Sequence, residues 1–126
     1  MDRLLRLSIS CVTPESYWEE HLIGFFTSTE EIDAAVKSLT SNGGSFSESC
    51  CKVRIEEVDV VGEDDSAECV YRFFGQNIDA SFEGDIIESP CYVEKSMAIQ
   101  ELMKAKRNTP RQQWHLQTHV IGKCNY

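Results

Sequence analysis

The chain has 126 residues, of which 41% are hydrophobic and 26% are charged, a composition that excludes a disordered protein and predicts one folded domain. Its formal net charge of −9 argues against binding to nucleic acid or to an anionic membrane, and favours a basic partner. The charge is uneven, since residues 1–103 hold all 21 acidic side chains against 7 basic ones, whereas residues 104–126 hold 5 basic side chains and no acidic one. No stretch approaches the roughly 20 apolar residues that a membrane-spanning helix needs.

The N-terminus and the cysteines favour a cytoplasmic protein. Residues 1–12 are apolar but carry Asp2, Arg3 and Arg6 and alternate in polarity, so we do not expect a signal peptide. Free thiols are expected, because several cysteines lie inside apolar patterns, where a cysteine packs as a small hydrophobe, and because the cytosol keeps thiols reduced. The six cysteines are Cys11, Cys50, Cys51, Cys69, Cys91 and Cys124.

The first third of the chain predicts two strands and a helix. Apolar residues alternate with polar ones over residues 5–11, the period of a half-buried strand. Glu15–Glu20 is predicted as an acidic turn, and His21–Phe26 as a second strand. Ser28, with Glu31 three residues later, forms a capping box that starts a helix. This helix is predicted to stop at the Asn-Gly-Gly of residues 42–44 and to bury Ile32, Ala35, Val36 and Leu39.

The middle of the chain predicts a third strand and an acidic hinge. Cys51, Val53 and Ile55 alternate with charged residues and are expected on the buried side of a strand. The alternation slips by one residue at Glu57, which predicts a β-bulge or a strand end there. Gly62–Glu68 follows as the acidic hinge.

The second half shows a similar order of elements. Strands are predicted around residues 69–74 and 82–87, and a final strand over Trp114–Val120. Ser89-Pro90 is expected to begin a second helix that runs to about Arg107, with serine as the cap and proline at the first helical position. The buried stripe of this helix is expected to use Tyr92, Ala98, Ile99, Leu102 and Met103.

This order of elements predicts an α+β fold, with a mainly antiparallel sheet and two helices on one face. The order strand, strand, helix, strand occurs twice, so the single domain of residues 1–126 is interpreted as two possible ββαβ half-repeats, 1–62 and 66–126. The predicted core includes Ile32, Val36, Leu39, Leu102, Trp114 and Leu116.

The sequence lacks recognisable catalytic and metal-binding motifs, and we predict no catalytic residue, metal or cofactor. It holds no nucleophile elbow, zinc-protease, P-loop or dinucleotide glycine motif. His115 and His119 in a strand would lie roughly 13 Å apart at about 3.3 Å per residue, too far for one metal ion. The acidic hinge lacks the EF-hand pattern and is interpreted as a solvated turn.

The acidic turn Glu15–Glu20 is the strongest candidate for a binding surface. Tyr and Trp are enriched in binding hot spots, and carboxylates steer basic partners. The alternative is that its aromatic rings cover the edge of the core, and the basic segment Lys104–Arg111 is a competing surface. We expect the partner to be bound by Tyr17, Trp18, Glu19, Glu20, Asp64 and Asp65, with the two aromatic residues as anchors.

In size, acidity, expected location and lack of catalytic motifs, the chain resembles the small acidic immunity proteins by which bacteria neutralise toxin domains, such as those of contact-dependent growth inhibition systems. The resemblance covers the whole chain, includes no motif and carries over no residue. It implies a tight one-to-one complex with a toxin domain, often a basic nuclease, whose active surface the protein masks. Two alternatives stay open: a regulatory domain that binds a small molecule, and a small hydrolase-type enzyme with His115 or His119 as base.

Overall fold

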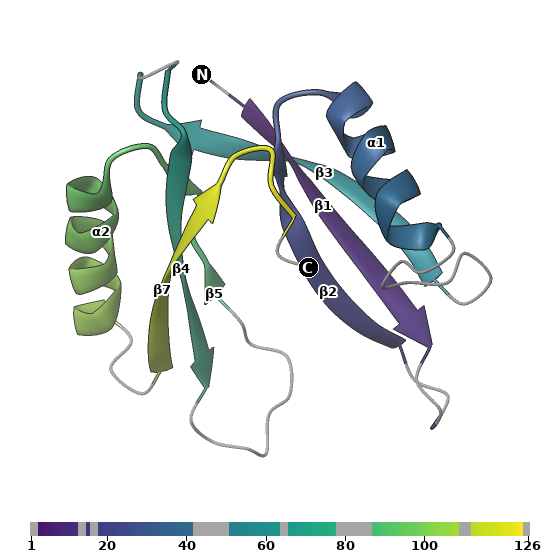
Figure 1. Ribbon diagram of the computed structural model, residues 1–126. Coiled ribbons are helices and arrows are strands. Elements are labelled where there is room, and N and C mark those ends of the chain that lie inside the picture. Colours follow the sequence, from purple (N-terminus) through teal and green to yellow (C-terminus); the bar gives the residue numbers. More distant parts are fainter. Residues whose placement is uncertain are drawn as a thin grey trace. The chain divides into compact units, whose positions relative to one another are not determined.

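The computed structural model describes residues 3–12, 15, 18–41, 51–63, 66–77, 87–108 and 112–124. It confirms an α+β fold with two helices and mainly antiparallel strand pairs (Figure 1). The chain divides into two compact units, which we name by their helices. The α1 unit comprises Arg3–Val58 and Val120–Tyr126, and the α2 unit comprises Met1–Asp2 and Asp59–His119. That the halves are repeats of one motif, with both helices on one face of a sheet, stays a prediction.

Three strands in the order β2-β1-β3 form the sheet of the α1 unit. β1 (Arg3–Val12) and β2 (Trp18–Phe26) make an antiparallel hairpin, and β3 (Cys51–Val61) is hydrogen-bonded on the other side of β1. A register shift between Leu7 and Ser8 marks an irregularity in the hairpin.

The hairpin extends further toward its tip than the sequence predicted. Val12 pairs with Trp18, so Trp18, Glu19 and Glu20 belong to β2, and the prediction that they form a turn was wrong. β-branched and aromatic residues favour strands, and a cross-strand pair of the two types stabilises a sheet. The Val12–Trp18 pair therefore extends the ladder into the predicted acidic turn.

Helix α1 (Thr29–Thr40) begins at its predicted cap. The Glu31 amide donates to Ser28 Oγ at 3.3 Å, and the Glu31 carboxylate accepts hydroxyl hydrogen bonds from Ser28 and Thr27. The predicted N-cap at Ser28 is therefore confirmed, whereas the described hydrogen bonds of the Glu31 carboxylate go to hydroxyl groups and not to the Ser28 amide that the capping box predicts. The predicted glycine stop lies outside the described residues. The helix covers a core that consists of Leu7, Ile9, Ile23, Phe26, Ile32 and Leu39, with Ala35 and Val36 partly buried against it.

β3 continues as one strand past Glu57, which excludes the predicted strand end there and leaves the β-bulge as a prediction. Val53 and Ile55 were expected on the buried side but are 44% and 45% exposed. In the described part of the chain, the core under α1 includes Cys51 but neither Val53 nor Ile55, so these two side chains lie beyond the part of β3 that packs against that core.

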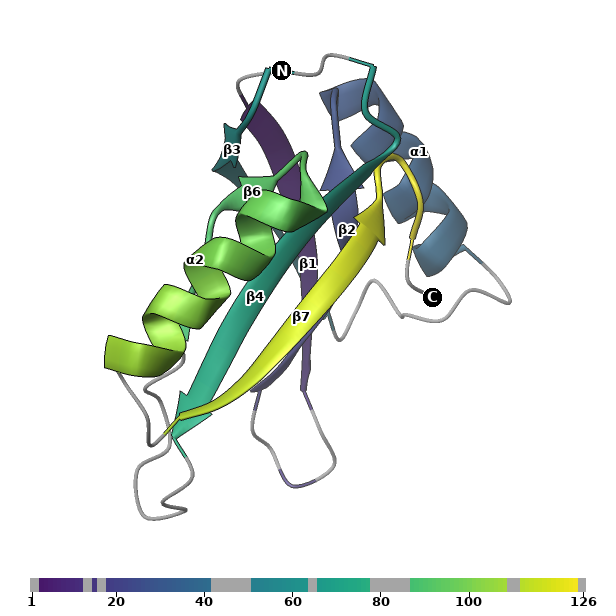
Figure 2. The same cartoon turned by 90° about the vertical axis from the view of Figure 1, so that its left-hand side faces the viewer.

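The sheet of the α2 unit is built around β4 (Cys69–Asn77). β7 (Gln112–Val120) pairs with β4, which confirms the final strand, and β5 (Ile87–Glu88) and β6 (Cys91–Tyr92) pair with β4 in antiparallel fashion. β6 also pairs in parallel with the end of β3. Figure 2 shows β4 and β7 side by side, with α2 (Lys95–Asn108) lying over β4. Residues 82–86 of a predicted strand lie outside the described residues.

Helix α2 starts at Lys95 and not at Ser89-Pro90, so that prediction was wrong. Ser89 has another role: the Phe73 amide donates to Ser89 Oγ at 2.9 Å, and the Ser89 amide donates to the Phe73 carbonyl at 2.9 Å. These bonds hold the segment along β4, and the next two residues are buried in β6. A Ser-Pro pair suits the edge of a sheet as well as a helix start, because proline lacks the amide that a ladder would need.

The buried stripe of α2 was predicted only in part. Ala98 and Leu102 are buried, as expected, but Ile99 and Met103 are 41% and 54% exposed. Tyr92, predicted in the same stripe, lies in β6 and not in the helix. The sheet-facing side of α2 follows Ala98, Leu102 and Ala105, at spacings of four and three residues. The core of the α2 unit consists of Phe73, Tyr92, Ala98 and Leu102, with Trp114 and Leu116 partly buried against it.

Candidate protein-binding surface

Trp18, at the start of β2, is 50% exposed, and its cross-strand neighbour Val12 is 42% exposed. The Lys52 ammonium of β3 lies 4.7 Å from the centre of the Trp18 ring. A cation at this distance is attracted to the negative face of the ring, by about 0.5–1 kcal/mol at an exposed site. The indole therefore has one charged neighbour, while half of its surface stays in contact with solvent.

Glu19 and Glu20, which follow Trp18, point to opposite faces of the sheet. Successive strand residues alternate between faces, and cross-strand partners share a face. Glu20 pairs with Ser10 and shares the face of Trp18, whereas Glu19 pairs with Cys11, whose side chain packs against the core under α1. Only Glu20 of these two predicted steering residues therefore lies beside the predicted anchor.

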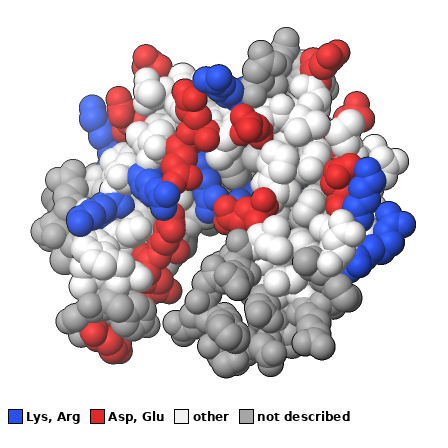
Figure 3. Space-filling model, turned by 180° about the vertical axis from the view of Figure 1, so that it is seen from behind, with Lys and Arg blue, Asp and Glu red and all other residues white. Residues whose placement is uncertain are grey.

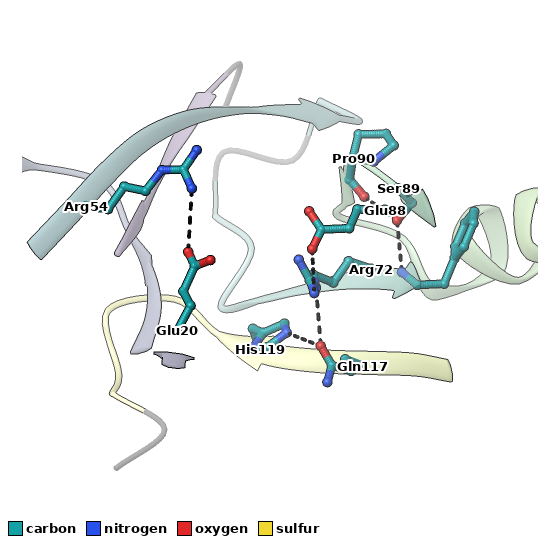
Figure 4. A network of polar contacts seen from close by, with 9 residues as sticks. Glu20, Arg54, Arg72, Glu88, Ser89, Pro90, Gln117 and His119 are labelled. Atoms are coloured by element: carbon teal, nitrogen blue, oxygen red, sulfur yellow. Dashed lines mark hydrogen bonds and ion pairs between the residues drawn. The ribbon is translucent and has the colours of Figure 1, made fainter. Parts of the chain in front are cut away.

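Arg54 links β3 to the face that carries Trp18. One of its nitrogens, Nη1, lies 3.8 Å from Glu20 Oε1, as Figure 4 shows, and Nη2 contacts a carboxylate oxygen of Glu56. All three side chains are substantially exposed, so each pair contributes at most about 1 kcal/mol to stability. Their main effect is to reduce the negative potential around Glu20.

A hollow of about 360 Å³ lies beside Trp18. We name it the Trp18 hollow, and it is lined by Ser10, Trp18, Lys52, Val53 and Arg54. Among the described residues that line it, two are cations and none is acidic, although acidic side chains outnumber basic ones by 21 to 12 in the chain. Among the residues that the structure describes, no carboxylate lies within ion-pair distance of Lys52.

The structure describes three of the six residues predicted to bind a partner. Trp18, Glu19 and Glu20 are all exposed on β2, while Tyr17, Asp64 and Asp65 lie outside the described residues. The sequence did not single out Lys52 and Arg54. Their signal is the alternation in β3, which puts both side chains on one face, but nothing in the sequence indicates that this face lies beside Trp18.

Acidic side chains are concentrated in one long stretch of the chain. Residues 55–94 hold 12 Asp and Glu against a single basic residue, Arg72, which is only 6% exposed. On the face drawn in Figure 3, red acidic side chains and blue basic ones lie intermingled. The competing basic segment is exposed at Lys106 and Arg107, in the last turn of α2.

A second group of polar side chains lies on β4, β7 and β5 in the α2 unit (Figure 4). Arg72 Nε donates to Gln117 Oε1 at 3.2 Å, and Arg72 Nη2 lies 3.9 Å from Glu88 Oε1. The same Gln117 oxygen lies 3.1 Å from His119 Nε2, so this ring nitrogen carries a proton and donates. The group links neighbouring strands through a buried guanidinium.

His115 and His119 lie on one face of β7, as predicted from their spacing, but their surroundings differ. His115 is exposed and stacks on Phe74, with ring centres 5.0 Å apart, whereas His119 is buried beside Gln117. Within the described part of the chain, no group of three or more His, Cys, Asp or Glu could hold a metal ion. These contacts are those of strand packing.

Burial changes the acidity of two groups outside the Trp18 hollow. It raises the pKa of the Cys124 thiol above its ordinary 9.0, and burial together with the Glu101 carboxylate raises the pKa of Tyr92. A raised pKa leaves less thiolate at neutral pH, so Cys124 is a poor nucleophile. The cysteines that the structure describes, Cys11, Cys51, Cys69, Cys91 and Cys124, are free thiols.

The described residues include no helix that is long and apolar enough to cross a membrane. The half-exposed Trp18 and the hollow beside it are the features that bear most directly on function. Comparisons of the chain with protein-family models, with curated proteins and with solved structures gave no match.

Proposed function

We propose that this protein acts by binding another protein at the face of the α1 unit that carries Trp18. The partner that fits best is a basic toxin domain, whose active surface the bound chain masks, so that the protein serves as a cytoplasmic immunity protein. The observation that carries the proposal is the half-exposed Trp18 beside the hollow, on a face with both cations and a carboxylate.

Trp18 has the surroundings of an interface anchor. Tryptophan dominates binding hot spots because it buries a large, rigid ring at low conformational cost, and the polar groups around it exclude water once the partner is in place. Val12 adds exposed apolar surface next to it, and Lys52, Arg54 and Glu20 form a charged rim. A partner that covers the exposed half of the indole gains apolar burial, which supports Trp18 as the anchor.

The acidic excess of the chain supports a basic partner. With 12 acidic side chains against one buried arginine over residues 55–94, the chain attracts positive surfaces from a distance. A nuclease active site is positive because it binds phosphates, so an acidic inhibitor associates with it rapidly. Near Trp18 the charge is mixed, and the acidic stretch therefore contributes to the rate of encounter while Trp18 contributes to the lifetime of the complex.

The proposal is tested by isothermal titration of the chain against the protein encoded by the gene next to its own. The expected result is a one-to-one complex whose affinity falls as the salt concentration rises, and cells that make the chain should survive production of that partner. A titration without heat, together with no protection of the cells, would contradict the proposal.

A further inference from the structure

We infer that the Trp18 hollow receives a carboxylate side chain of the partner protein, held by Lys52 and Arg54. The inference rests on the proposed function, since the carboxylate belongs to the protein that Trp18 anchors. It adds one specific feature: within a partner surface that is basic as a whole, an acidic residue next to an apolar one meets this hollow.

The lining of the hollow supports an anionic ligand group. The two charged residues in the described part of its lining are both cations, and Ser10 adds a hydroxyl that can donate a hydrogen bond. The charged residues of this chain are more often acidic than basic, since it holds 21 acidic and 12 basic side chains, and the two cations of the hollow go against this composition. Glu20 and Glu56 offset the charge of Arg54 at the edge of the hollow, so Lys52 supplies the positive charge that attracts an anionic group there.

Lys52 is the part of this lining that is available to a partner. Its ammonium lies over the Trp18 ring at 4.7 Å, and no carboxylate among the described residues lies within ion-pair distance of it. An aromatic face orients a cation without neutralising it. The ammonium thus keeps its full charge at a defined position beside the residue that we propose as the anchor.

Arg54 provides a second contact that can be exchanged. Its Nη1 lies 3.8 Å from Glu20, longer than a hydrogen bond of about 2.7–3.2 Å, so this pair is loose. Arg54 Nη2 contacts Glu56, so the exchangeable contact for a partner carboxylate is the one at Nη1. A partner carboxylate that replaces Glu20 at Arg54 would keep the number of ion pairs unchanged and would leave Glu20 free to meet a basic residue of the partner.

A contact between a partner carboxylate and the cations Lys52 and Arg54 would also make this surface selective among partner proteins. A partner that presents only basic residues at this position would face Lys52 and Arg54 as like charges, which costs binding energy. A partner with one acidic residue at the matching position avoids this cost. The same surface would therefore reject basic proteins in general, including most nucleic-acid-binding proteins, that the acidic field attracts.

The probe is a pair of capped dipeptides, acetyl-Leu-Glu-amide and acetyl-Leu-Gln-amide, which differ only in the charge of one side chain. Their binding is followed by the nuclear magnetic resonance shift of the Trp18 indole N–H, assigned with Trp18→Phe, with the Trp114 indole as internal reference. The glutamate peptide should bind about two- to fivefold more tightly than the glutamine peptide. Lys52→Met should abolish this difference, and Lys37→Met, which removes an exposed lysine of α1, should leave it intact.

The inference would be overturned by equal affinity of the two peptides or by the absence of a shift with either peptide. It would also be overturned by equal shifts at Trp114, or by a preference for the glutamate peptide that survives Lys52→Met. These outcomes are distinct from failure of the proposed function, which is measured with the partner protein. If Trp18→Ala weakens the complex and Lys52→Met does not, the proposed function stands and the carboxylate contact is refuted. If the glutamate preference holds but the partner binds Trp18→Ala normally, the hollow binds carboxylates and the proposed interface is wrong.

Discussion

Glu19 and Glu20 are neighbours in the sequence but lie on opposite faces of β2, opposite Cys11 and Ser10 respectively. Only the face of Glu20 also carries Trp18. Adjacent carboxylates thus have different positions relative to the proposed interface, and each is a matched control for the other.

Charge reversal should separate the two glutamates. Glu20→Lys should slow association with the partner several-fold at low salt and weaken its salt dependence, because it places a positive charge on the interface face. Glu19→Lys makes the same change in net charge on the other face and should have a smaller effect. Stopped-flow association rates provide the measurement, and reversal of Lys106 and Arg107 should change them little. A larger effect of Glu19→Lys would place the interface on the opposite side of the sheet.

Truncation of the α1 core should separate buried from exposed apolar residues. Ile32 lies on the buried side of α1 and is fully buried, so Ile32→Ala should lower the free energy of unfolding by about 2–5 kcal/mol. Val53→Ala removes an apolar side chain that is 44% exposed and should change it by only about 0.5 kcal/mol. Urea denaturation measures both. Comparable losses would mean that another part of the protein covers β3 and that Val53 is buried in solution.

The contact between Ser89 and β4 should stabilise the α2 unit. Ser89→Ala removes the hydroxyl that accepts the hydrogen bond of the Phe73 amide, and this amide stays partly buried without that acceptor. The free energy of unfolding should therefore fall by about 1–3 kcal/mol. Ser96→Ala, at an exposed position in the first turn of α2, is the control and should be close to neutral. If Ser89→Ala is neutral as well, the segment does not pair with β4 in the way described.

Alkaline stability should depend on Cys124. Its folded-state pKa is raised by burial above 9.0, so the unfolded chain loses this thiol proton at a lower pH than the folded one. The stabilising contribution is complete below the unfolded pKa and is lost as pH rises through the folded value. Cys124→Ala should therefore flatten the loss of stability above about pH 9, measured by denaturation at several pH values. An unchanged slope would show that the thiol has the same pKa in both states.

Local signals predicted the elements of this fold better than their boundaries. The capping box at Ser28 and Glu31 located the start of α1, because both partners lie within one turn of the chain. Ser89-Pro90 does not begin the helix as predicted, because Ser89 forms a hydrogen bond with Phe73 instead. Phe73 lies sixteen residues away, so no local sequence pattern contains this bond. Ile99 and Met103 were also assigned to the wrong side of α2, and Tyr92, counted in the same stripe, lies in β6 and not in the helix.

The candidate site shows the same division between local and long-range information. Trp18 could be predicted as an anchor from its residue type and its acidic neighbours. Lys52 could not, because it reaches Trp18 only through the pairing of β1 with both β2 and β3. The sequence therefore predicted an acidic surface, whereas the structure has cations beside the anchor and the acidic excess in another stretch of the chain.

The dissociation constant of the complex with Trp18→Ala tests the central claim most directly. If Trp18 is the anchor, this variant should bind the neighbouring gene's protein at least about 30-fold more weakly, the effect of a hot spot worth about 2 kcal/mol. Met103→Ala removes an apolar side chain that is 54% exposed on α2 and serves as the control, with binding unchanged. Equal affinity of the wild type and Trp18→Ala, or a larger loss with Met103→Ala, would contradict the account.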